Sequence, residues 1–361
     1  MDQLAKMASD GGFTKSRGTL HIEIMALAAE MEPKVAAAVL KALDGLQSRV
    51  TLKALKEALE TGNVAAALSL MDAESFVADF APAKTSIEDA AFAGGALAAG
   101  SSIVRLTGAA FVFERLNPRL IDWLTEYNLG LIQQISENTR EGVRDALLEG
   151  MNSGSGAAAT ARKVRPLVGL TKHQAGAVSR YRKELETFHE RQSAKGWNLG
   201  GKISRRNGRQ VYAIDDKGNP VDLINERRLR DFRYDGITRR AMETGKPIPQ
   251  AKIDQMVEAY ARKYRKHRSE MIARTETLRA TNVGVQDAWR QAIEGGKVDE
   301  AAVVREWIVG RDERLCQTCA PIPSLNKKGV AMGTPFATPK GPMLLPPAHP
   351  ACRCTIFIRA D

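Results

Sequence analysis

The sequence predicts a mainly α-helical protein with an N-terminal helical region, a long central helix and a small C-terminal α+β domain. Aromatic residues make up only 6% of the 361 residues, and hydrophobic residues 43% with many alanines, which suits close helix packing. Apolar residues recur at helical spacing from 249 to about 295. Two short β-rich stretches, 303–309 and 355–358, are expected to be strands that bracket a cysteine-rich loop and could pair with one another.

Helix signals organise the first 195 residues into two predicted regions. In residues 1–85, Pro33 is expected to start a helix and Thr51 to cap a second, as in a small helical bundle. In the middle region, 86–195, the helix starts and caps are expected at Asn117-Pro118, Thr139 and Thr171. None of these segments suggests catalytic chemistry.

Residues 90–113 form the most apolar stretch of the middle region, but glycines, serines and Arg105 interrupt it. A membrane-spanning helix needs about 20 predominantly apolar residues, so no stable membrane span is predicted. We interpret the stretch as a buried or sliding helix with small-residue contacts. A membrane-active amphiphilic segment is the alternative.

The net charge of +11 suggests an anionic neighbour such as nucleic acid. Residues 196–248 read as a basic loop or hairpin insertion punctuated by glycines, and a second basic run covers 262–274. The residues predicted to face DNA are Arg262, Lys263, Arg265 and Lys266. The plainer interpretation is a solvated face that confers solubility, since most charge runs do no more than that.

All four cysteines lie in the last fifty residues, in the groups Cys316-x-x-Cys319 and His349-x-x-Cys352-x-Cys354. A Cys-x-x-Cys turn aims two thiolates at one point, and a second such group can complete a tetrahedron around zinc. Cys316, Cys319, His349 and Cys352 are the preferred set, with Cys354 as the alternative fourth ligand. Ordinary buried thiols and disulfides are the competing interpretations. Because five donors favour a closed site, we predict structural rather than catalytic zinc.

The long helix carries Arg274 and Glu276, two residues apart and therefore on different faces. We predict that both are structural clamps, which hold the helix to the zinc-bearing strands through charge-assisted hydrogen bonds. No Gly-x-Ser-x-Gly elbow, phosphate loop or His-Glu-x-x-His motif is present. The protein is therefore predicted not to be an enzyme.

The motifs of residues 250–358 resemble those of the phage head morphogenesis family, the minor head proteins similar to protein F of phage Mu. The resemblance rests on these residues, in this order: Arg274-Thr275-Glu276, Ala280-x-Asn282-x-Gly284, Trp307, Asp312-Glu313, Cys316-x-x-Cys319 and Pro346-Pro347-x-His349-Pro350-x-Cys352-Arg353-Cys354. Residues 249–361 are thus expected to form a domain like that of minor head proteins. Residues 1–85 match no family pattern.

The resemblance implies a virion protein associated with the portal or the inner capsid, present in multiple copies and acting in head morphogenesis, and in DNA packaging or ejection. Its implied partners are the portal protein, the major capsid protein and packaged DNA, in the phage head or, during assembly, in the host cytoplasm. The alternative function is an enzyme acting on nucleic acid or protein, with Glu276 near the zinc site.

Overall fold

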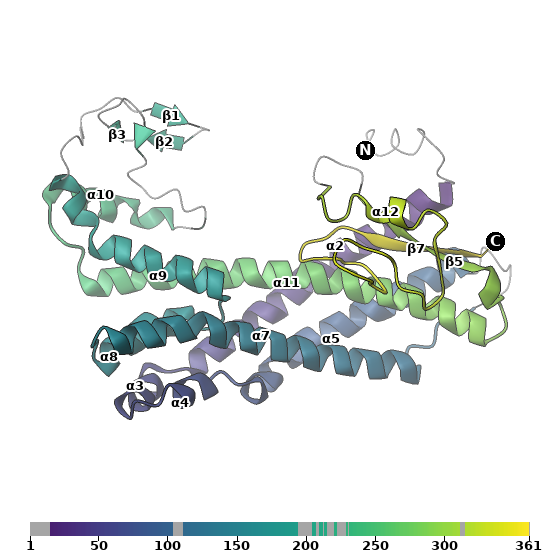
Figure 1. The fold of residues 1–361 in the computed structure, drawn as a ribbon, viewed down its shortest axis with the longest axis horizontal. Helices are drawn as coiled ribbons and strands as arrows, with labels where there is room; N and C mark the ends of the chain where they lie inside the picture. Colours follow the sequence, from purple (N-terminus) through teal and green to yellow (C-terminus); the bar gives the residue numbers. More distant parts are fainter. Residues whose placement is uncertain are drawn as a thin grey trace. The chain divides into compact units, whose positions relative to one another are not determined.

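A computed structural model describes residues 15–103, 111–193, 204–206, 209–211, 213–214, 220–221, 229, 231–310 and 315–360 (Figure 1). Most of these residues are helical, and the one sheet near the C-terminus has three strands. The prediction of a mainly α fold with a long helix and a small C-terminal α+β segment is therefore confirmed. No helix in the described part of the chain has both the length and the apolar character needed to cross a bilayer.

The α-helices are α2 (Lys15–Arg49), α3 (Leu52–Glu60), α4 (Val64–Ser69), α5 (Ala73–Ala98), α7 (Pro118–Asn152), α8 (Ala157–Val164), α9 (Lys172–Glu186), α10 (Asp235–Thr244), α11 (Gln250–Glu294) and α12 (Ile322–Leu325). A π-helix, Ala99–Ile103, follows α5. The strands are β1 (Ser204–Arg206), β2 (Arg209–Val211), β3 (Ala213–Ile214), β4 (Pro220–Val221), β5 (Val303–Ile308), β6 (Val330–Ala331) and β7 (Thr355–Ala360).

Several predicted helix boundaries are confirmed. Thr51 and Thr171 cap α3 and α9, because their hydroxyls accept hydrogen bonds from backbone N–H groups in the first turn. Two boundaries were wrong. Pro33 lies inside α2 rather than at its start, and Thr139 lies inside α7, where its hydroxyl donates to the Ile135 carbonyl. That bond lets a buried threonine remain in a helix interior.

The chain forms two compact units, each built from separate stretches of sequence. Unit 1 comprises residues 1–42, 77–132 and 268–361, and unit 2 comprises 43–76 and 133–267. The sequence prediction divides the chain in another way, into the consecutive segments 1–85, 86–195, 196–248 and 249–361. Because helix packing brings distant stretches together, each unit here is discontinuous in sequence.

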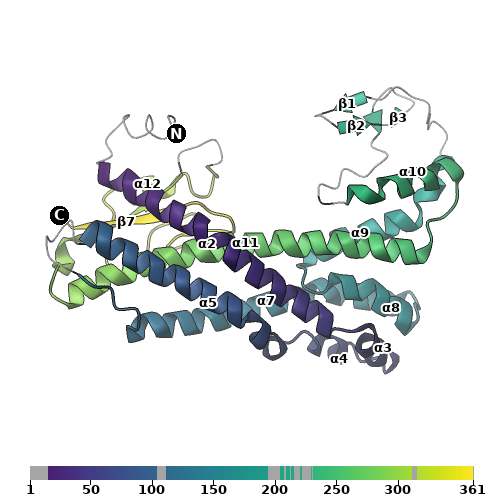
Figure 2. The ribbon, with the colours of Figure 1, turned by 180° about the vertical axis from the view of Figure 1, so that it is seen from behind.

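In unit 1, α2 and α5 lie side by side (Figure 2), and Lys34 forms an ion pair with Asp89. The helices α5 and α11 approach so closely that only glycine fits at the contact. A Cβ atom on Gly94 would lie 2.2 Å from the Thr281 carbonyl oxygen, and one on Gly284 would lie 1.8 Å from the Ala91 carbonyl oxygen. The predicted small-residue contacts are therefore real up to the π-helix, whereas residues 104–110 lie outside the described part.

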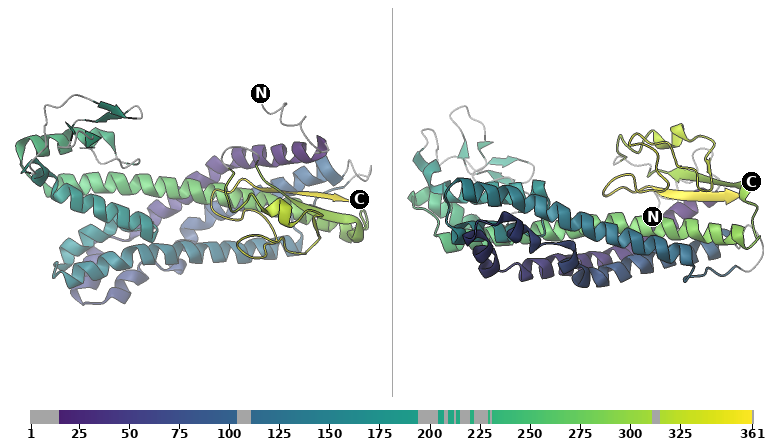
Figure 3. Two further views of the ribbon diagram at one scale, coloured as in Figure 1. Left: turned by 45° about the horizontal axis from the view of Figure 1, so that its top comes forward. Right: turned by 60° about the horizontal axis from the view of Figure 1, so that its bottom comes forward.

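The sheet of unit 1 has the antiparallel order β6-β5-β7. Trp307 pairs with Ile356 in the β5–β7 register, so the two strands predicted to bracket the cysteines do pair. The sheet and its loops lie along the C-terminal half of α11 (Figure 3). Ile356 and Ile358 of β7 are buried against the rest of the unit, which positions the chain just before β7 at the helix surface.

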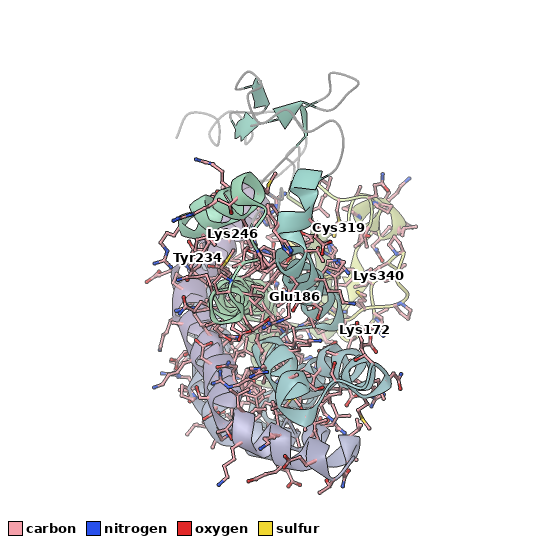
Figure 4. All side chains as sticks on the ribbon, turned by 90° about the vertical axis from the view of Figure 1, so that its left-hand side faces the viewer. Lys172, Glu186, Tyr234, Lys246, Cys319 and Lys340 are labelled. Carbon is pink, nitrogen blue, oxygen red and sulfur yellow. The ribbon has the colours of Figure 1, made fainter. Side chains whose placement is uncertain are left out.

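Unit 2 contains α3, α4, α8, α9 and α10 with the remaining parts of α7 and α11. Its core includes the aromatic pair Tyr181 and Tyr260, whose ring centroids are 4.7 Å apart. Lys172 and Glu186 mark the two ends of α9 (Figure 4). Of the basic insertion predicted at 196–248, the structure describes the short strand pairs β1–β2 and β3–β4 and the helix α10.

Candidate metal centre

Two tight turns present the donor residues of the cysteine-rich segment. In the first, the Cys319 N–H donates to the Cys316 carbonyl at 3.1 Å and to the Cys316 Sγ at 3.4 Å. In the second, the Cys352 N–H donates to the His349 carbonyl, also at 3.1 Å. Ala351 adopts a positive φ of 56° in this turn. Each turn therefore places two donors, three residues apart, on the same side of the chain.

The turns bring five side chains together. The His349 Nε2 lies 3.0 Å from the Cys316 Sγ and 3.2 Å from the Cys319 Sγ. The Cys319 Sγ lies 3.6 Å from the Cys352 Sγ. The donor atoms fall into two groups of three, each within 4.8 Å: Cys316, Cys319 and His349, and Cys319, Cys352 and Cys354. These five residues could hold a metal ion, and Cys319 belongs to both groups.

The spacing fits a tetrahedral ion. Zn–S bonds of about 2.3 Å at the tetrahedral angle place two sulfur atoms about 3.8 Å apart, close to the 3.6 Å between Cys319 and Cys352. A disulfide needs an S–S bond of about 2.0 Å, and all four cysteines are free thiols here. The four cysteines therefore form no disulfide in this structure.

His349 is held in the orientation that a metal ligand requires. Its Nδ1 lies 2.8 Å from the Pro350 carbonyl oxygen, and because a carbonyl only accepts, the ring donates there. The Nε2 lone pair of the neutral ring then points at the thiols. A hydrogen bond of this kind fixes the tautomer and direction of histidine ligands in metalloproteins.

Cys352 and Cys354 form a buried thiol pair, exposed by only 1% and 2%. A hydrogen bond from the Cys354 thiol lowers the pKa of Cys352 well below that of a free cysteine. The same bond, followed by burial, raises the pKa of Cys354.

Buried neutral side chains of α11 fix the metal-binding segment to the helix. The Thr275 hydroxyl accepts a hydrogen bond from the Ala351 N–H at 3.0 Å, and the Asn282 Oδ1 accepts one from the Ile356 N–H at 3.0 Å. Asn282 is fully buried, and its Nδ2 also donates to the Leu278 carbonyl at 2.9 Å. The sequence analysis named Arg274 and Glu276 as the anchors and did not name Thr275 or Asn282. A signal for Thr275 and Asn282 was nevertheless present, because both belong to the motifs that carry the family resemblance.

Arg305 organises the loop that precedes the second turn. It is fully buried, and its guanidinium donates to Gln286 of α11 and to the backbone carbonyls of Ala331, Thr334 and Leu344. Burial lowers the pKa of Arg305 to about 10, so it remains a cation at neutral pH. One side chain thereby joins β6, the following loop and the long helix.

The structure corrects the role predicted for Arg274 and Glu276 as clamps onto the zinc-bearing strands. Glu276 is buried, but it accepts a hydrogen bond from the Tyr127 hydroxyl of α7 and pairs with Arg279 of its own helix at 3.4 Å. Arg274 is half-buried, and its charge acts on Glu32 of α2. The charged residues thus face neighbouring helices, whereas Thr275 between them faces the metal-binding segment.

The four basic residues predicted to face DNA do not share one surface. Arg265 is only 2% exposed and is bound to Asp44 at 2.9 Å and to Glu258 at 2.7 Å, so its assignment to a DNA-facing surface was wrong. Lys263 is half-buried, 5.8 Å from the centroid of the Phe232 ring. Arg262 and Lys266 are exposed and lie four residues apart on one face of α11.

Comparison with protein-family models, with curated proteins and with solved structures finds no match to this chain.

Proposed function

We propose that this chain is a structural minor head protein of a tailed phage, whose C-terminal segment is closed by one zinc ion on Cys316, Cys319, His349 and Cys352. One observation carries the proposal. The residues that supply the family resemblance also join the segment to α11: Thr275 and Asn282 bind its backbone, and Gly284 lets α5 pack against the helix. Contacts of this kind hold parts of the chain together, which supports a structural role rather than a catalytic one.

The donor set supports a closed site. Four protein donors satisfy a tetrahedral zinc ion, whereas a catalytic zinc keeps one position for water. A zinc ion bound there would hold the two turns together. The Cys319, Cys352 and Cys354 side chains are buried, which limits access of a substrate to the ion.

The alternative, an enzyme that uses Glu276 beside zinc, has less support. Glu276 lies one residue after Thr275, about 100° further round the helix, and its carboxylate is engaged by Tyr127 and Arg279. Burial raises the pKa of Glu276, which would suit a general acid, but burial also keeps it from substrate.

We further propose that the protein binds the portal or the inner capsid, is present in multiple copies, and lies beside packaged DNA. Of the four residues of the predicted basic surface, Arg262 and Lys266 are the exposed ones, and we propose that they contact phosphate. Contacts to phosphate would give an affinity that falls steeply with salt and has no sequence preference.

Two measurements test this function. Mass spectrometry and cryo-EM of virions from the phage that encodes this chain should place it at the portal vertex or inner capsid surface. Metal analysis of the purified protein should find close to one equivalent of zinc. Absence from virions would contradict the structural role, and stoichiometric disulfides without metal would contradict the zinc site.

A paired variant tests the DNA contact. Replacing Arg262 and Lys266 with glutamate should weaken DNA binding. The same double change at Lys53 and Lys56, exposed residues of α3 with acidic neighbours one turn away, serves as the charge-matched control. Equal loss in both proteins would show only a net-charge effect.

A further inference from the structure

The metal centre has one more donor than a tetrahedral ion can use. The two turns account for four donors, since each has the same backbone hydrogen bond between its first and fourth residues. Cys354 lies outside both turns. It immediately precedes Thr355, the first residue of β7, which pairs with Ile308 of β5. Its position is therefore set by the sheet and not by a turn.

Cys354 is nevertheless within reach of the ion. Its sulfur, with those of Cys319 and Cys352, belongs to a group whose donor atoms all lie within 4.8 Å of one another. Cys319 belongs also to the group with Cys316 and His349, so it is common to both sets. Because Cys354 shares a group with both Cys319 and Cys352, a rearrangement of the segment could place its sulfur beside Cys319 in the position of the Cys352 sulfur.

We propose that Cys354 is a reserve ligand, which takes the fourth position whenever Cys352 cannot bind the metal. This inference rests on the zinc site of the proposed function. Among the described residues, Cys316 and His349 have no substitute of this kind, because the fifth donor is grouped with Cys319 and Cys352. The ion would then stay bound if Cys352 alone were oxidised or alkylated, and the segment would remain attached to the sheet.

Cobalt(II) is the probe, because the intensity of its thiolate-to-metal charge-transfer bands reports the number of bound thiolates. The full-length protein is titrated with Co²⁺ as wild type and as the variants Cys316→Ser, Cys352→Ser, Cys354→Ser and Cys352→Ser/Cys354→Ser. Three thiolates are expected in the wild type and in each of the Cys352→Ser and Cys354→Ser proteins. Two are expected in the double variant and in Cys316→Ser, which is the matched control for loss of one cysteine.

The affinities provide a second readout. Cys352→Ser should weaken Co²⁺ binding by no more than about 100-fold, the scale on which changes around a metal ligand act, and the double variant should lose more. Circular dichroism verifies that each variant keeps its helices.

Three results would overturn the proposal. They are two thiolates in Cys352→Ser, four thiolates in the wild type, and no Co²⁺ binding by the wild type. The last would remove the zinc site as well. Absence of the protein from virions, with the expected cobalt spectra, would refute only the head-protein function.

Discussion

Two contact regions of the long helix α11 differ in their chemistry. Where α11 carries the metal-binding segment in unit 1, its neutral side chains accept hydrogen bonds from backbone N–H groups: Thr275 from Ala351, and Asn282 from Ile356. In unit 2 it is held by charge: Arg265 binds Asp44 and Glu258.

The difference follows from the backbone hydrogen-bonding groups that each region leaves without a partner in secondary structure. Ala351 lies in the irregular chain before β7, and Ile356 lies in β7, which is an edge strand of its sheet. Their N–H groups therefore need acceptors that no neighbouring strand provides. Amides and hydroxyls supply these without the large desolvation cost of an ion. Unit 2 packs regular helices whose backbone is already satisfied. There a buried arginine can join helices through partners that keep part of their hydration: the Asp44 and Glu258 side chains are 44% and 32% exposed.

Metal removal should show the largest difference between the regions. With free zinc about 1,000-fold above its Kd, binding contributes about 4 kcal/mol to unit 1, and a chelator should remove this. Hydrogen exchange measured by mass spectrometry should speed up in residues 315–360 and remain unchanged in α8 and α9. Equal loss of protection in both units would break the comparison.

Substitution of Arg265 should show the reverse pattern. Arg265→Met leaves Asp44 and Glu258 without their cation, and it should destabilise unit 2 by about 3 kcal/mol, the lower end for a broken buried pair because the carboxylates are partly exposed. Urea unfolding with exchange readout on α9 measures this. Arg262→Met, on the exposed face, is the matched control and should change stability by less than about 0.5 kcal/mol.

Loss of the Asn282 amide should have a smaller effect that is confined to unit 1. Asn282→Leu leaves the Ile356 N–H buried without an acceptor, which costs about 1–3 kcal/mol. Asn138, a half-buried residue, is the control, because it makes the same bond to the carbonyl four residues earlier in an exposed position. If Asn138→Leu costs as much as Asn282→Leu, the bond to β7 is not what stabilises the segment.

The smallest expected effect is on pH dependence. Burial raises the pKa of Glu276 above 4.5, so the folded state binds its proton more tightly than the unfolded state. The stability from this group is present below pH 4.5 and is lost as pH rises through the folded pKa. Unfolding free energies of Glu276→Gln and wild type, measured from pH 4 to 8, should therefore diverge in favour of the variant. Parallel curves would show that the carboxyl is not desolvated.

The sequence by itself determined the elements whose signals are local. The periodicity of α11, the caps Thr51 and Thr171, the two strands around the cysteines and the paired donor groups were all predictable. Each depends on residues within a few positions of one another, where spacing and backbone chemistry decide the structure.

Only the tertiary structure decided which side chains of α11 face which neighbour. Arg274 and Glu276 looked like the anchors of the metal-binding segment because charge is conspicuous in a sequence. In the structure, Thr275 and Asn282 hold the metal-binding segment to the helix. Arg265, which was predicted to face DNA, is buried and forms ion pairs. Sequence periodicity shows which residues share a helix face. It cannot show which segment, more than seventy residues away, packs against that face, because that depends on how the whole chain buries its apolar surface.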